Sequence, residues 1–235
     1  MGLPKATHPI HKMVLPSTKR EVRFRPYLVK EEKILLMATE SNDEMEMVNA
    51  TKQVLRNCLL DEDLDIDEMT IFDMQYAFIQ LRAKSVGEIA ELKVICKDCT
   101  HPNDYQLNFS ELEVVIPDDL DFRIHLTDGI GVTMRFPRVG LLNHFAKADM
   151  LEADNAIFLI MACIENIWDE KTVYNPRDET MEEQIEWVES LSRRDMEKIE
   201  EFTRKIPTVT KKVEFKCSEC GAQNVRDIGG MTDFF

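Results

Sequence analysis

The chain has 235 residues and a formal net charge of −15 at pH 7, and it is long enough to bury a sizeable core. So acidic a balance argues against a protein that binds the phosphate backbone of nucleic acid. The longest apolar run, 156–164, is too short to cross a bilayer, and the first residues lack the apolar stretch of a secretory signal. We therefore expect a cytosolic protein.

The N-terminal segment is basic, unlike the rest of the chain. Residues 1–30 contain seven basic residues and a single acid, Glu21. Four prolines exclude a long helix there, and the alternation in 22–25 predicts an edge strand. We expect an extended basic arm over residues 1–30. It either folds back onto the chain's own body or binds a partner's acidic surface through Arg20, Arg23 and Arg25; contact with nucleic acid is a third alternative.

A helical region is predicted after the arm. Residues 31–38 begin with two acids, which favour the positive end of a helix dipole. Residues 41–44 offer an N-cap for a second helix that runs to about residue 60. An acidic loop separates it from 68–85, whose apolar side chains cover much of the helix circumference. We expect this third helix to be central and mostly buried.

Strand patterns dominate the middle of the chain. Short strands are predicted at 91–95, 106–109 and 112–116. Residues 122–126 and 132–136 alternate strictly between apolar and polar, and an Asp-Gly pair lies between them. This pattern predicts a β-hairpin.

Helices are predicted again from about residue 141. They include the strongly apolar segment 156–168 and two acidic helices at 180–191 and 194–205, the second with Ser192 as its N-cap. A last strand is predicted at 211–216. These elements indicate the α+β class: a helical body with a small antiparallel sheet, in a single domain over residues 31–235.

Four of the six cysteines form two C-x-x-C pairs, Cys96, Cys99, Cys217 and Cys220. In the segments 92–109 and 211–228 a short strand enters the pair and polar turn residues follow, as in a zinc knuckle. Two intervening residues let both sulfurs reach one ion at about 2.3 Å. Four thiolates complete a tetrahedral shell with no open position, so the sequence predicts a split zinc ribbon around one structural zinc ion.

Alternatives to the zinc site remain open. The same four thiolates suit iron, and each C-x-x-C pair could act as a separate redox pair. His101 could be an outer group or a substitute ligand, whereas Cys58 and Cys163 fit helical apolar patterns and are expected to be plain core residues. Gly221 suits the tight turn after its cysteine pair, and Thr100 matches that turn less well.

The sequence contains no recognisable catalytic constellation. It has no H-E-x-x-H, no G-x-S-x-G and no phosphate-binding glycine loop, and we expect a protein that is not an enzyme. The chain ends in Phe234 and Phe235, which are expected to pack either on this chain or in a partner's groove.

Several motifs together resemble a known family. They are Leu15-Pro16-Ser17 before the extended 22–25, Leu81-Arg82-x-x-Ser85 before the first C-x-x-C, and C-x-x-C-G before a terminal Phe-Phe. This combination is similar to the baseplate hub (assembly) protein family of T-even-type contractile-tailed phages, the gene twenty-six product-like proteins. The resemblance covers nearly the whole chain and implies a role in building the hub or tail, with no catalytic residues.

The resulting hypothesis is a non-enzymatic, zinc-stabilised assembly protein acting in the host cytoplasm through contacts with other baseplate hub or tail proteins. The basic arm and the Phe-Phe end are the candidate contact surfaces. One alternative is a structural hub subunit retained in the virion baseplate, and another is a zinc-ribbon nucleic-acid-binding factor. No membrane and no small-molecule substrate are expected.

Overall fold

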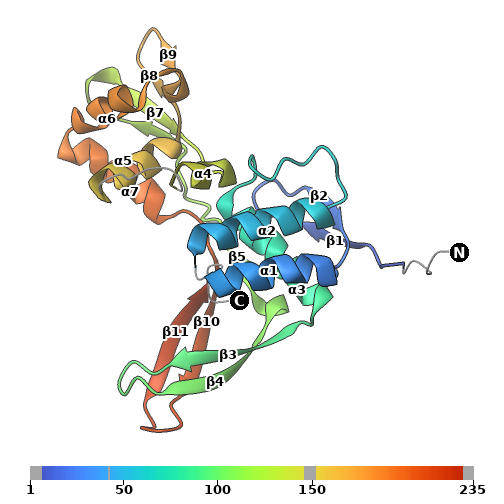
Figure 1. Cartoon of the computed structure of the whole chain (residues 1–235). Helices are drawn as coiled ribbons and strands as arrows, with labels where there is room; N and C mark the ends of the chain where they lie inside the picture. The colour runs from blue at the N-terminus through green and yellow to red at the C-terminus, as the bar shows by residue number, and fades with distance from the viewer. Residues whose placement is uncertain (1–6, 42, 146–151, 230–235) are drawn as a thin grey trace, which may run out of the picture. The chain divides into compact units, whose positions relative to one another are not determined.

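A computed structural model describes residues 7–41, 43–145 and 152–229 (Figure 1). The chain forms two compact units, and each is described by itself. Unit 1 takes its residues from 1–66, 72–115 and 208–235, and unit 2 from 67–71 and 116–207. The class is α+β, with several small antiparallel sheets. The described part of the N-terminal segment belongs to unit 1, and 116–207 has a hydrophobic core of its own.

Three helices belong mainly to unit 1: α1 (Val29–Ser41), α2 (Glu44–Cys58) and α3 (Ile71–Ser85). The carboxylate of Asp43 caps α2 by accepting from the backbone N–H groups of the first turn. Most of the apolar side chains of α3 are fully buried, among them Phe72, Phe78 and Leu81. This confirms the prediction of a central buried helix.

The N-terminal segment forms a hairpin, and the predicted edge strand is its second strand. Strand β1 (His11–Val14) pairs antiparallel with β2 (Glu21–Phe24), in a sheet of two strands. Val22 and Phe24 are buried, because the inward residues of β2 alternate with exposed ones. The loop between the strands is held to α3, where the buried Asp73 accepts from the backbone N–H of Ser17 at 3.0 Å and from its hydroxyl.

Two long hairpins complete unit 1 (Figure 1). One pairs β3 (Ile89–Ile95) with β4 (Pro102–Asn108), and the other pairs β10 (Val209–Lys216) with β11 (Gln223–Gly229). The short β5 (Glu113–Val114) adds to the edge of β10. The inward side chains of both hairpins meet in one cluster with residues of α3, including Ile79, Leu107, Val213 and Ile228.

Unit 2 contains a four-stranded meander and helices packed on it. The strands follow in the order β6 (Arg123–His125), β7 (Gly131–Met134), β8 (Ile164–Trp168) and β9 (Val173–Tyr174). Its helices are α4 (Leu142–Phe145), α5 (Glu152–Ala162), α6 (Met181–Glu189) and α7 (Arg193–Arg204). Short 3₁₀ turns lie at Phe109–Glu111 in unit 1 and at Thr127–Gly129, Val139–Leu141 and Pro176–Asp178 in unit 2.

Two local predictions in unit 2 are confirmed. The hairpin β6–β7 turns at Asp128 and Gly129, whose φ angles are 60° and 75°, the region that an Asp-Gly turn requires. Ser192 caps α7, because its side chain accepts from the backbone N–H of Asp195.

The prediction of a helix over 156–168 is wrong in its second half. Helix α5 ends at Ala162, and Ile164–Trp168 forms β8, which pairs with both β7 and β9. A continuous apolar run has no period that separates a buried helix from a buried strand. Pairing with β7 favours the strand over the helix. The Trp168 ring of β8 packs on Gly131 of β7, so closely that a Cβ on residue 131 would lie 2.0 Å from the ring.

Within the described part of the chain, no helix combines the length and apolar character needed to span a membrane.

Candidate metal centre

The two hairpins of unit 1 carry the four predicted cysteines in their turns. In the first turn the N–H of Cys96 donates to the carbonyl of His101 at 3.0 Å, and the N–H of Thr100 donates to the carbonyl of Cys96 at 3.1 Å. The second turn repeats both bonds, from Cys217 to Ala222 at 2.9 Å and from Gly221 to Cys217 at 3.0 Å. The two turns therefore share one backbone design.

The residue after each cysteine pair adopts a left-handed conformation. Gly221 has φ 75° and Thr100 has φ 59°. Threonine rarely occupies this region because its branched side chain crowds the backbone. The sequence match at Thr100 was weak for this reason, yet the chain makes the same turn at both places.

The four sulfur atoms lie together, as the sequence predicted. The Sγ atoms of Cys96 and Cys220 are 3.8 Å apart, those of Cys99 and Cys217 are 3.6 Å apart, and all four lie within 4.8 Å of one another. A disulfide would bring two sulfurs to about 2.05 Å. Four metal–sulfur bonds of about 2.3 Å in a tetrahedron place the sulfurs about 3.8 Å apart. The spacing fits a shared metal ion, and both short contacts join one hairpin to the other.

The electrostatics of the cluster also favour a cation. The N–H of Cys220, the strongest influence, lowers the pKa of Cys217 to about 6. The pKa of Cys99 is raised to about 12 even though the N–H of His101 favours its thiolate, because the other thiols surround it. Thiolates at this separation repel one another, so all four ionise together only around a positive ion.

Asn103 reaches across from the first hairpin to the second turn. Its Oδ1 accepts from the backbone N–H of Ser218 at 2.8 Å and from its hydroxyl at 3.0 Å. Its Nδ2 lies 3.6 Å from Cys217 Sγ and also donates to the carbonyl of His101, in its own turn, at 2.9 Å. The side chain is buried, with 7% of its surface exposed.

Asn224 makes the reciprocal contacts from the second hairpin. Its Oδ1 accepts from the backbone N–H of Lys97 at 2.9 Å, and its Nδ2 lies 3.3 Å from Cys96 Sγ. The same Nδ2 donates to the carbonyl of Ala222 at 3.1 Å. Neither asparagine was predicted from the sequence, although C-x-x-C-x-x-x-N occurs at both turns and marks their positions.

The other cysteines and His101 stay outside the cluster. Cys58 and Cys163 are fully buried, and burial raises the pKa of Cys58 to about 11 and that of Cys163 to about 12. His101 contributes its backbone carbonyl to the first turn. Among the described residues, the group of metal-ligating side chains found contains only the four cysteines.

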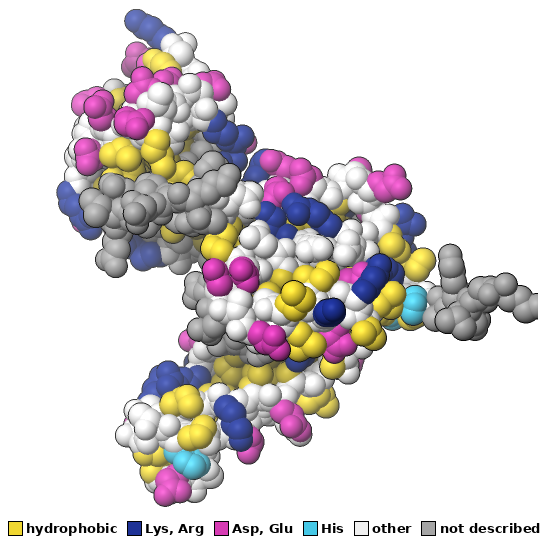
Figure 2. Space-filling view, in the orientation of Figure 1, with side chains coloured by type: hydrophobic (Ala, Val, Ile, Leu, Met, Phe, Trp, Pro, Cys, Tyr) yellow, Lys and Arg dark blue, Asp and Glu magenta, His cyan; other side chains and the backbone are white. Residues whose placement is uncertain are grey.

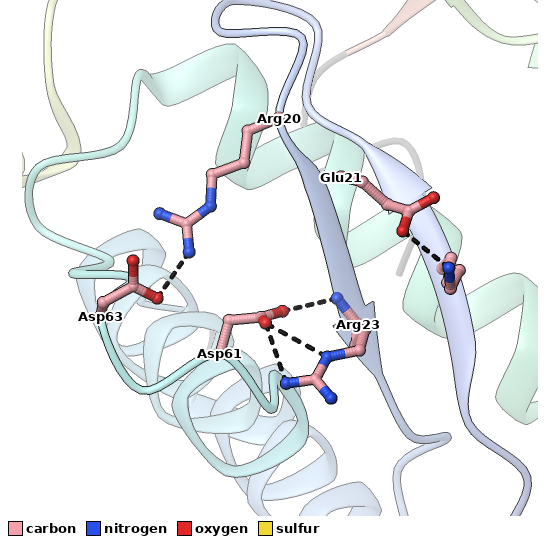
Figure 3. Close-up of polar contacts among 6 residues, drawn as sticks. Arg20, Glu21, Arg23, Asp61 and Asp63 are labelled. Atoms are coloured by element: carbon pink, nitrogen blue, oxygen red, sulfur yellow. Dashed lines mark hydrogen bonds and ion pairs between the residues drawn. The ribbon is translucent and has the colours of Figure 1, made fainter.

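Two of the predicted contact arginines bind acids of the chain itself (Figure 3). Arg20 Nη2 lies 2.6 Å from Asp63 Oδ1. Asp61 accepts from the backbone N–H of Arg23 at 2.6 Å and pairs with its guanidinium at 3.2 Å. The acidic loop between α2 and α3 thus holds the outer edge of β2.

The third arginine, Arg25, is largely buried. Its Nη2 lies 3.0 Å from Glu31 Oε1, whose side chain has no exposed surface, and 2.9 Å from the carbonyl of Asn57. Over these residues the basic segment folds back onto its own unit, which was the first of the sequence-based alternatives. Phe234 and Phe235 lie outside the described residues.

Comparison with known proteins adds two findings. The family described as T4 bacteriophage base plate protein matches residues 8–235. The chain is also similar to the baseplate hub assembly protein gp26 of Enterobacteria phage T4, with 24% identity over 215 residues that cover 91% of this chain and 92% of that protein. No solved structure matches.

Proposed function

Because the chain belongs to the T4 bacteriophage base plate protein family, we propose that it is a non-enzymatic protein of baseplate hub assembly that works through protein–protein contacts. The family membership agrees with the resemblance inferred from the sequence. The observation that carries the proposal is the near-complete mutual coverage with a protein named for baseplate hub assembly. The partners would be other baseplate hub or tail proteins, met in the cytoplasm of the infected host.

An exposed apolar face on α1 supports a contact function. Val29, Leu36 and Met37 expose 80%, 59% and 61% of their surfaces, although neighbouring side chains of the same helix are buried. In Figure 2, apolar side chains gather over this part of unit 1. A cluster of exposed apolar side chains on one helix is typical of a surface that another protein covers.

Substitution of this face tests the proposal. We expect Leu36→Lys with Met37→Lys to keep the thermal stability of the chain and to abolish its capture of hub or tail proteins in an infected-cell pulldown. A matched control is Glu40→Lys, an exposed change on the same helix that adds positive charge without removing apolar surface. Failure of the wild-type chain to capture any baseplate protein would overturn the proposed function.

A second candidate is a hub subunit that stays in the virion, and the family's description as a base plate protein favours it. Mass spectrometry of purified particles separates the two candidates. A retained subunit appears in a fixed ratio to other baseplate proteins, whereas an assembly factor is absent.

A role in nucleic-acid binding has less support. The face shown in Figure 2 carries acidic and basic side chains interspersed. Arg20 and Arg23 are paired with acids, although Arg23 keeps 54% of its side chain exposed. We retain these two arginines and the Phe234–Phe235 end as proposed contacts for a protein partner; Arg25, only 18% exposed, is better placed to stabilise its own unit.

We further propose that the four cysteines hold one structural zinc ion in a split zinc ribbon. The sulfur spacing and the crowding of thiols support this assignment. Four thiolates leave no position for a water ligand, so the ion would fasten the two hairpins and not catalyse a reaction. Elemental analysis of freshly purified protein should find one zinc per chain; iron in its place would be detected in the same measurement.

A further inference from the structure

We propose that Asn103 and Asn224 are positioning residues of the metal centre, each of which locks the opposite cysteine turn and orients a thiolate in it. This inference rests on the proposed zinc site. It concerns side chains that are not themselves ligands, and it assigns to each of them a contact across the centre.

The first support is the reciprocity of the contacts. Asn224 donates from Nδ2 towards Cys96 Sγ at 3.3 Å, and Asn103 does so towards Cys217 Sγ at 3.6 Å. Each asparagine lies four residues after the second cysteine of its own turn, and each reaches the first cysteine of the other turn. The two segments thus place an asparagine at equivalent positions, and each asparagine contacts the equivalent cysteine of the opposite turn.

The second support is that each amide uses both its oxygen and its nitrogen. The oxygen of Asn224 accepts from the N–H of Lys97 at 2.9 Å, and that of Asn103 accepts from the N–H of Ser218 at 2.8 Å. These backbone groups lie directly after the cysteine that the amide nitrogen contacts. A carboxamide carries a donor and an acceptor at a fixed spacing, which neither aspartate nor leucine provides. One side chain therefore holds both a thiolate and the next backbone N–H of the turn.

The third support is burial. Asn103 and Asn224 expose 7% and 3% of their surfaces. A buried polar side chain is costly unless its groups are bonded, and here both ends of each amide have partners. Truncation would leave a backbone N–H and a thiolate without their partners in a place that water reaches poorly.

These contacts have a direct consequence for metal binding. A divalent ion with four thiolates carries a net negative charge, and N–H donors directed at the sulfurs stabilise that charge. Groups that orient metal ligands in this way change metal affinity by roughly 10–100-fold when they are removed. The asparagine contacts also join the two turns through protein atoms alone, so they bring the sulfurs together before an ion arrives.

The test uses the full-length protein and cobalt(II) as a spectroscopic probe of the thiolate site. We expect Asn103→Ala and Asn224→Ala each to weaken cobalt binding by roughly 10–100-fold and to shift the sulfur-to-cobalt charge-transfer band. Asn108→Ala is the matched control, because Asn108 ends the same hairpin as Asn103 and its side chain accepts from the backbone N–H and the hydroxyl of Ser110, outside the cysteine turns. This control should bind cobalt with unchanged affinity and spectrum.

A graded series guards against variants that do not fold. Asn→Ser retains a shorter donor and acceptor, whereas Asn→Asp retains the acceptor and places a negative charge beside the thiolates. We expect affinity to fall in the order Asn, Ser, Ala, Asp at both positions. Equal affinities and spectra across folded variants would overturn the inference and leave the zinc site standing. If the wild-type protein bound neither zinc nor cobalt, the zinc proposal itself would fail, and this inference with it.

Discussion

Thr100 and Gly221 occupy equivalent positions in the two cysteine turns, with φ angles of 59° and 75°. Glycine adopts this region freely, whereas for a residue with a Cβ it costs roughly 1–2 kcal/mol. The hydroxyl of Thr100 donates to the carbonyl of Cys99 at 2.7 Å, which anchors the side chain in its turn. The first turn is therefore under more conformational strain than the second.

Exchange of these residues should change stability in opposite directions. We expect Thr100→Asn to raise the free energy of unfolding by about 1 kcal/mol, because asparagine tolerates the left-handed region. Gly221→Thr should lower it by a similar amount. Urea unfolding of the metal-loaded protein measures both, and a loss of stability in the Thr100 variant would contradict the interpretation.

The pair of Arg25 and Glu31 shows how a single buried charge depends on its partner. Burial opposes the ionised form of Glu31, yet hydrogen bonds from Arg25, from the backbone of Leu28 and from Lys30 outweigh it and lower the pKa of this carboxyl. A depressed pKa means that ionisation of Glu31 stabilises the folded state above the carboxyl's ordinary pKa of about 4.3. This contribution is lost as the pH falls through the lower, folded-state value.

We expect Glu31→Ala to lower the free energy of unfolding at pH 7 by about 3 kcal/mol, because the largely buried charge of Arg25 would lose its carboxylate partner. The adjacent Glu32→Ala is the control, since Glu32 is exposed and its loss should change stability by less than about 0.5 kcal/mol. The difference between the two variants should shrink as the pH is lowered below about 4. Thermal unfolding at several pH values measures this difference. A difference between the two variants that stays constant with pH would contradict the assignment.

At the scale of elements, the two hairpins of unit 1 meet at their cysteine turns. Their inward side chains share a hydrophobic cluster near α3, whereas the cysteine turns lie at the far ends of the strands. Each turn is a small loop with little apolar surface of its own. The two hairpins are joined at those ends by the contacts across the centre and by Arg226, whose guanidinium donates to the carbonyl of Ile95 at 3.1 and 3.2 Å.

Metal removal should loosen these ends selectively. We expect a strong chelator to speed amide hydrogen exchange in 92–109 and 211–228, and to leave the exchange of β6–β9 in unit 2 unchanged. Mass spectrometry of exchanged peptides resolves the two regions. Equal acceleration in both would mean that the ion stabilises the whole chain and not the hairpins.

At the scale of the whole molecule, residues 116–207, which form most of unit 2, are an insertion into unit 1. The chain leaves unit 1 after β5 and returns at β10, and these strands are paired, with Val114 opposite Val209 and Glu113 opposite Thr210. The two points of exit and entry are therefore neighbours within unit 1. Because these points are neighbours, the hairpin with the second cysteine pair belongs to the same unit as the first hairpin, although more than a hundred residues separate the two pairs in the sequence.

Unit 1 should consequently keep its metal centre without the insertion. We expect a chain in which a short glycine-rich turn replaces residues 116–207 to bind one zinc ion, because β5 and β10 are already adjacent. The same chain with Cys217→Ser and Cys220→Ser is the control and should bind none tightly. A deletion variant that folds but takes up no metal would show that the hairpins need unit 2 to meet.

Local signals in the sequence were sufficient for features that depend on neighbouring residues. The Asp-Gly turn at 128–129, the cap at Ser192 and the C-x-x-C pairs all follow from the chemistry of a few consecutive side chains. The C-x-x-C spacing is also a selective signal, because in a cytosolic chain it indicates metal binding or redox chemistry and little else. The candidate ligands could therefore be named from the sequence even though 118 positions separate Cys99 from Cys217.

Tertiary structure alone decided the features that depend on distant partners. Ile164–Trp168 became a strand because β7 and β9 offered hydrogen bonds and Gly131 left room for the Trp168 ring. Arg20 and Arg23 pair with acids of their own unit because folding places beside them an acidic loop that is 38 or more positions away in the sequence. The motif C-x-x-C-x-x-x-N marks Asn103 and Asn224 in the sequence, but which thiolate each amide contacts is decided only when folding brings the two hairpins face to face.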